Sequence, residues 1–132
     1  MAKKALQHAE ELAKTCGAEN ILFQVIPLMP TYGAPDLMRP VIVDEKQKEA
    51  AEMDLTMLAE EMRTRGYKAT ATVRIGQQVA AEIIDFAKER GVDLIVICTH
   101  GYSGITGWAL GSVARKLLTR AETPILLIHS NR

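Results

Sequence analysis

Hydrophobic positions along this chain alternate between two periodicities, one helical and one typical of strands. The first helical stretch has apolar residues three and four positions apart and should end at Gly17. Its apolar members are Ala2, Ala5, Leu6, Ala9, Leu12 and Ala13. Residues 21–28 form a short apolar run with β-branched and aromatic members, and Pro27 and Pro30 close it. This pattern predicts a buried strand after the first helix.

The alternation of helix and strand continues after residues 31–40, which hold two of the five prolines and Gly33 and predict a surface loop. Further helices are expected over residues 44–65, ending before Gly66, over residues 79–90, ending before Gly91, and over residues 111–121. The first of these helices places Ala51, Leu55, Leu58, Ala59 and Met62 on one side. Further strands are expected over residues 68–75, 92–97 and 124–129. The strict two-residue period of residues 68–75 indicates a strand near the sheet edge. The continuous apolar run over residues 92–97 indicates a central parallel strand.

The order of these elements predicts a fold class. Four strands that alternate with four helices predict right-handed crossovers and a parallel α/β sheet with helices on both faces. We find no repeat or linker, so residues 1–132 are expected to form a single domain. In such sheets ligands bind outside the carboxyl ends of the strands. The exits from the expected strands at Ile97 and at Val25 should therefore flank one cleft.

Charge and cysteine content narrow the set of partners. Lysine plus arginine and aspartate plus glutamate number 16 each, so no net field favours nucleic acid or an anionic membrane. The apolar runs are too short to cross a bilayer. Cys16 and Cys98 do not resemble the dense, even set of a secreted disulfide scaffold. We therefore expect a cytoplasmic protein with neither a nucleic-acid nor a membrane partner.

The stretch with the clearest chemical signal begins at Cys98 and reads C-T-H-G-Y-S-G-I-T-G-W-A-L-G-S. It follows an apolar strand and leads into an amphipathic helix. Backbone N–H groups and the positive end of a helix dipole at such a junction can hold an anion, usually a phosphate. The simpler interpretation is that the glycines form a turn, Ser112 caps the helix, and His100 is an ordinary loop residue.

This junction resembles the universal stress protein family, whose ATP-binding members show G-x2-G-x9-G-[S/T] here. Gly101, Gly111 and Ser112 fit the spacing, whereas Cys98 stands at the position of the first glycine. Residues 76–84, 92–96 and 123–128 also resemble the family, so the likeness covers essentially the whole chain. The resemblance implies a Rossmann-like, adenine-nucleotide α-hydrolase-like fold.

The same resemblance implies ATP as ligand, with or without magnesium, and a set of site residues. Backbone groups near Gly101 and the N–H groups of Gly111, Ser112 and Val113 would contact phosphate, and His100 would contact ribose or phosphate. Val25 and Ile97 would form an apolar slot for adenine, beside Cys98. No metal site is expected, because Cys98 and His100 lack a second pair of ligands. Cys98 is either a redox-sensing thiol or a small packed residue.

Family members normally open with a strand that ends near V-D-G-S, whereas this chain begins inside the helix that follows it. That strand would be the central one, and the resemblance assigns its aspartate to adenosine. Each buried backbone group left without a hydrogen bond would cost about 1–3 kcal/mol. We therefore expect the remaining strands to pair differently or to borrow a strand from a partner.

The resemblance implies a homodimeric stress-response regulator that is tuned by bound ATP rather than by turnover. The apolar strand that begins at Pro124 and ends at His129 would pair with its symmetry mate. One alternative is a dimeric interaction module that binds no nucleotide, which Cys98 favours. The other is a weak ATPase or phosphotransferase. We expect no enzyme, because no residue is an evident general base or metal carboxylate.

Overall fold

The computed structural model describes residues 2–28, 45–99 and 110–129. Its elements follow the expected alternation of helix and strand, which confirms the predicted α/β class. They are α1 (Ala2–Cys16), β1 (Glu19–Pro27), α2 (Glu45–Thr64), β2 (Lys68–Gly76), α3 (Val79–Glu89), β3 (Ile95–Cys98), α4 (Ser112–Arg120) and β4 (Ile125–Ile128). The loop predicted over residues 31–40 lies outside the described residues.

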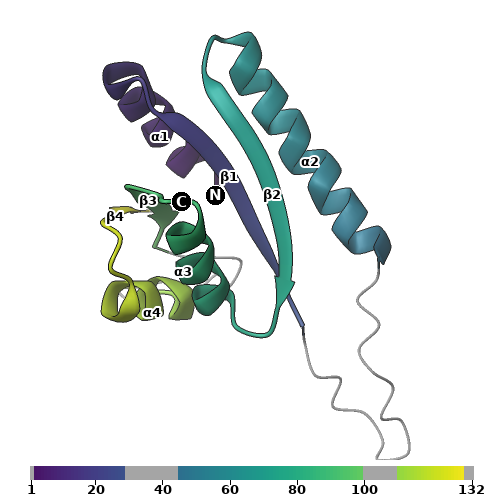
Figure 1. The fold of residues 1–132 in the computed structure, drawn as a ribbon, viewed down its shortest axis with the longest axis vertical. Coiled ribbons are helices and arrows are strands. Elements are labelled where there is room, and N and C mark those ends of the chain that lie inside the picture. The colour runs from purple at the N-terminus through teal and green to yellow at the C-terminus, as the bar shows by residue number, and fades with distance from the viewer. Residues whose placement is uncertain (1, 29–44, 100–109, 130–132) are drawn as a thin grey trace, which may run out of the picture. The chain divides into compact units, whose positions relative to one another are not determined.

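The chain groups into two compact units, of which one spans Glu19–Val79. In this β1–β2 unit the two strands run parallel, in register from Glu19 opposite Lys68 to Pro27 opposite Gly76. The long helix α2 lies along β2 (Figure 1). The predicted inner side of α2 is confirmed at Ala59 and Met62, which are almost fully buried.

The other unit comprises Met1–Ala18 and Ala80–Arg132. In this β3–β4 unit Ile95 pairs with Ile125 and Cys98 with Ile128, again in parallel, and α1 packs against β3. Its core is apolar and includes a residue from every helix of the unit and from both strands. The buried side chains are Ala13, Ala80, Phe86, Ala87, Ile95, Ala114, Leu117 and Ile128.

Three helices end with the same glycine conformation. Gly17, Gly66 and Gly91 have φ angles of 65°, 93° and 61°, a region that L side chains rarely adopt. After α2, Tyr67 N donates to Met62 O at 3.1 Å and Gly66 N donates to Arg63 O at 3.0 Å. These bonds form a Schellman motif, which satisfies carbonyls that the helix end would leave unpaired. The glycines that were predicted to end these helices therefore do so.

The strand predicted over residues 92–97 begins later than its apolar run, because β3 starts at Ile95. Val92 N donates to Ala87 O at 2.9 Å, so Val92 still belongs to the cap of α3. The ladder with β4 starts at Ile95, whose N–H donates to Pro124 O at 2.9 Å. Hydrophobicity at Val92 and Leu94 therefore marks the approach to the strand, and the strand is shorter than the predicted 92–97 run at its start.

The strands pair as two separate two-stranded sheets, β1 with β2 and β3 with β4. The expected central strand and its aspartate stay predictions. Among the helices of the described residues, none is long and apolar enough to cross a membrane.

Candidate functional site

The strand-to-helix junction of the β3–β4 unit is held together by backbone hydrogen bonds on both sides of the glycine-rich segment. Thr99 N donates to Ile128 O at 3.0 Å, which extends the ladder one residue beyond β3. Gly111 N donates to Thr99 O at 2.9 Å. The end of β3 and the start of α4 are therefore adjacent, so the first turn of α4 lies at the carboxyl end of the strand.

The first turn of α4 has no side-chain cap. Gly111 is the N-cap residue, with φ −58° and ψ 154°, and Ser112 is the first residue of the helix. The interpretation of Ser112 as the cap is therefore wrong. Arg115 N donates to Gly111 O at 3.0 Å, so the N–H groups of Ser112, Val113 and Ala114 precede the first intrahelical bond. These three donors lie at the positive, N-terminal end of the helix dipole, where a bound anion is stabilised.

The role predicted for Gly111 changes with this geometry. Its N–H was expected to hold phosphate, but it is engaged with Thr99 O. Ala114, which the sequence interpretation did not include, has an N–H without an intrahelical acceptor, as the first N–H groups of an α-helix do. Counting three residues forward from an N-cap glycine would have found it.

Charge near the start of α4 also favours an anion. The first turn contains no acidic side chain. Arg115, which the sequence interpretation missed, extends its guanidinium back so that Nη2 donates to Leu110 O at 3.5 Å. This exposed cation lies beside the residue that precedes the N-cap. The sequence could have pointed to Arg115, because it lies one helical turn after Gly111 and so near the start of the helix.

The other predicted site residues lie on both units or outside the described residues. Ile97 and Cys98 are half-buried on β3, directly before this junction, and Val113 is half-buried on α4. Val25 is half-buried on β1, in the other unit. His100 and Gly101 lie outside the described residues, so their predicted contacts and the cleft expected between Val25 and Ile97 stay predictions.

Metal ligands and thiols are the remaining chemical groups to place in the described parts of the chain. Within residues 2–28, 45–99 and 110–129, no three His, Cys, Asp or Glu side chains gather in a way that could hold a metal ion. Neither Cys16 nor Cys98 forms a disulfide. The groups at the described junction that can donate to an anion are the backbone N–H groups at the start of α4, the Ser112 hydroxyl and the Arg115 guanidinium.

Comparison with known sequences finds one family over nearly the whole chain. Residues 1–129 match the universal stress protein family. The universal stress protein YxiE of Bacillus subtilis is 32% identical over 136 residues, covering 97% of this chain and 90% of that protein. The universal stress protein MJ0531 of Methanocaldococcus jannaschii is 30% identical over 125 residues, covering 95% and 73%.

Solved structures share the fold at lower identity. Protein MJ0577 of Methanocaldococcus jannaschii aligns with a TM-score of 0.80 at 23% identity, covering 99% of this chain and 89% of that one. A universal stress protein from Archaeoglobus fulgidus in complex with dAMP aligns at 0.61 and 23% identity, covering 96% and 86%. A universal stress protein in complex with cAMP aligns at 0.66 and 19% identity, covering 97% and 87%.

Proposed function

Because the chain belongs to the universal stress protein family, we propose that it binds an adenine nucleotide, ATP in particular, and acts as a stress-response regulator without strong turnover. The observation that carries this proposal is the uncapped start of α4. Its N–H groups at Ser112, Val113 and Ala114 lie at the carboxyl end of β3, where parallel α/β folds bind ligands. Structural relatives in complex with dAMP and cAMP support the choice of an adenine nucleotide.

The residues of the junction fit a phosphate group in sign and donor type. Backbone N–H groups and the Arg115 guanidinium donate, and no carboxylate in the first turn opposes an anion. Magnesium is assigned no protein ligand, because the described residues hold no suitable cluster. Mg²⁺ in nucleotide sites is commonly held by the substrate phosphates together with one or two carboxylates and water.

Calorimetric titration of the full chain with ATP, with and without magnesium, tests this proposal. We expect a dissociation constant in the micromolar range, which corresponds to about 8 kcal/mol of binding free energy. Absence of heat at millimolar ATP from a folded sample would contradict it. That result would favour the alternative of a nucleotide-free interaction module, which the presence of Cys98 at the family's first glycine position supports.

The proposal includes a homodimer formed through β4. Among the described strands β4 pairs only with β3, so its second edge carries backbone groups that a symmetry mate can pair. Pro124 O and Ile128 O accept bonds from the β3 side. Because strand residues alternate, the backbone groups of Ile125 and Leu127 point to the other edge. Leu127 is half-buried on a strand of four apolar residues.

Replacing Leu127 by proline is expected to convert the dimer to a monomer at micromolar concentration. Proline removes the outward N–H at this position and leaves the β3 ladder intact, as edge strands tolerate. Light scattering after size-exclusion chromatography measures the mass. Leu127→Ala, which retains the N–H, is the matched control and should remain dimeric. A monomeric wild-type protein would contradict the proposed dimer.

The family match over residues 1–129 also supports one functional domain over residues 1–132. The cytoplasmic location stays a prediction from the sequence.

A further inference from the structure

The outer edge of β2 offers backbone hydrogen-bonding groups. Asn20 Nδ2 donates to Lys68 O at 3.5 Å and Leu28 N donates to Gly76 O at 2.9 Å, so the even-numbered residues of β2 face β1. Odd-numbered residues face the other edge, because successive backbone groups alternate. Among the described strands β2 pairs only with β1. Ala71 and Val73 therefore present their N–H and C=O groups to the outer edge.

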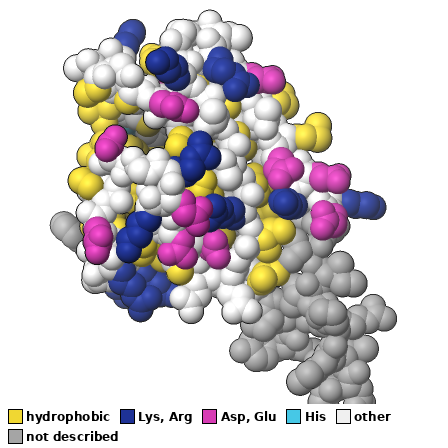
Figure 2. All heavy atoms as spheres, in the orientation of Figure 1, with side chains coloured by type: hydrophobic (Ala, Val, Ile, Leu, Met, Phe, Trp, Pro, Cys, Tyr) yellow, Lys and Arg dark blue, Asp and Glu magenta, His cyan; other side chains and the backbone are white. Residues whose placement is uncertain are grey.

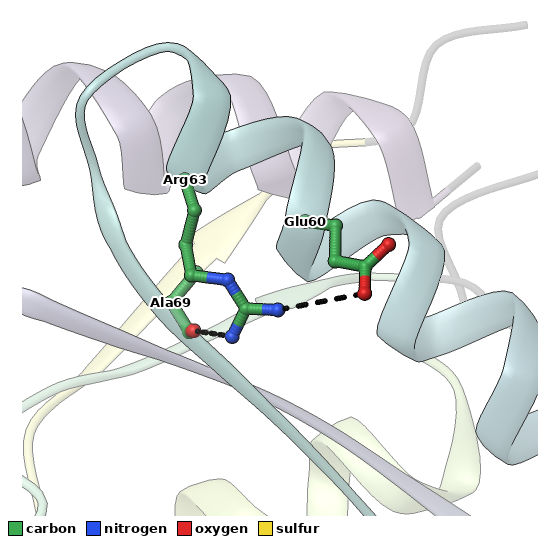
Figure 3. Close-up of polar contacts among 3 residues, drawn as sticks. All are labelled: Glu60, Arg63 and Ala69. Carbon is green, nitrogen blue, oxygen red and sulfur yellow. Dashed lines mark hydrogen bonds and ion pairs between the residues drawn. The ribbon is translucent and has the colours of Figure 1, made fainter.

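One end of this edge is already covered by a side chain. Arg63 of α2 donates from Nη1 to Ala69 O at 3.0 Å, and its Nη2 lies 4.0 Å from Glu60 Oε1 (Figure 3). Figure 3 shows the guanidinium between the carboxylate and the strand carbonyl. Charged side chains that occupy edge groups are a common protection against strand pairing. Among the described residues this side-chain cover ends at Ala69, and the backbone groups of Ala71 and Val73 have no partner there.

A groove of about 290 Å³ runs between α2 and this uncovered part of the edge. Glu52 and Thr56 line it from the helix, and Ala71, Thr72 and Val73 line it from the strand. The groove thus combines the backbone donors and acceptors of β2 with the Glu52 carboxylate of α2.

Charge on α2 decides the kind of occupant. The helix carries six acidic and three basic side chains, and hydrophobic side chains protrude among the charged ones along it (Figure 2). A second copy bound edge to edge would bring two net-negative helices together, which is unfavourable. A segment rich in lysine or arginine complements the same surface. Glu52 pairs with Lys48 at 3.7 Å, but an exposed pair contributes only about 0–1 kcal/mol and exchanges readily.

We propose that the outer edge of β2 and the adjoining face of α2 bind an extended, basic segment of another protein, which adds to β2 as a further strand. Main-chain bonds to Ala71 and Val73 supply affinity, and Glu52 selects for positive charge. The surface lies within Glu19–Val79 and requires no nucleotide, so this inference stands apart from the proposed function.

The probe is a synthetic peptide, acetyl-Lys-Val-Lys-Val-Lys-amide, added to the ¹⁵N-labelled full chain. We expect its binding to shift the amide resonances of Ala71 and Val73. Ala71→Pro removes an outward N–H at a position where edge strands tolerate proline, and should weaken binding about tenfold. Glu52→Gln should weaken binding about threefold, as loss of an exposed ion pair does.

Matched controls separate strand addition from general attraction. Glu61→Gln makes the same charge change on the opposite side of α2 and should leave binding unchanged. A backbone N-methylated peptide with the same side chains should not bind, which tests the main-chain bonds without altering the protein. The proposal is overturned if the peptide leaves the folded chain unshifted at millimolar concentration, if an acidic Glu-Val-Glu-Val-Glu peptide binds equally, or if the same amides shift through self-association alone.

Discussion

Replacing Leu117 by alanine is expected to lower the free energy of unfolding by about 3 kcal/mol. Leu117 lies within α4, and its side chain is fully buried in the β3–β4 unit. Truncation removes apolar contacts and leaves a cavity that close-packed neighbours fill only in part. Domains of this size have net stabilities of about 5–15 kcal/mol, so the loss is a large fraction of the total. Urea unfolding followed by circular dichroism measures it.

The adjacent residue provides the control. Leu118→Ala makes the same chemical change on the same helix, but Leu118 is 46% exposed. Its expected loss is below about 1 kcal/mol, because little surface leaves or enters water. Equal losses from the two variants would mean that α4 does not pack through the Leu117 side. The packing of α4 through Leu117 matters for the proposed function, because α4 also supplies the proposed phosphate donors.

The order of elements could be predicted because hydrophobic periodicity and glycine positions both depend on local sequence. The side of α2 that carries Ala59 and Met62 was visible in their spacing, and the core confirms it. Gly17, Gly66 and Gly91 ended their helices as predicted, because a positive φ angle strongly favours glycine. Signals of this kind depend on residues that are close together in the chain.

Boundaries set by hydrogen-bond competition were not predictable from hydrophobicity. Val92 is as apolar as a strand residue, yet its N–H completes the cap of α3. The pairing of strands into two sheets is likewise a property of tertiary structure.

The start of α4 was predicted in position, whereas its backbone and side-chain contacts were predicted only in part. The spacing of Gly111 and Ser112 correctly placed a helix start after β3. It did not show that Thr99 O would engage the Gly111 N–H, or that Arg115 would extend back toward Leu110. Those contacts depend on where the chain returns after the glycine-rich segment, which a motif does not encode.

Replacing Ser112 by proline is expected to raise the dissociation constant for ATP about thirtyfold, which corresponds to about 2 kcal/mol. The variant removes one N–H donor from the proposed phosphate site together with the hydroxyl. Proline is well tolerated at the first position of a helix, where its missing N–H breaks no intrahelical bond. The preceding Gly111 has φ −58° and ψ 154°, the extended conformation that a residue before proline prefers. Calorimetry measures the affinity, and circular dichroism checks that the helix content is retained.

Ser112→Ala separates the two groups that proline removes. It deletes the hydroxyl and keeps the N–H, so its expected effect is about fivefold or less, as for a single neutral hydrogen bond. A proline variant that binds ATP as tightly as the wild type would contradict a phosphate contact at this amide. Equal weakening by both variants would assign the contact to the hydroxyl. The proline variant is expected to bind ATP much more weakly than the alanine variant. That order of affinities requires a contact between the nucleotide and the backbone at the start of α4.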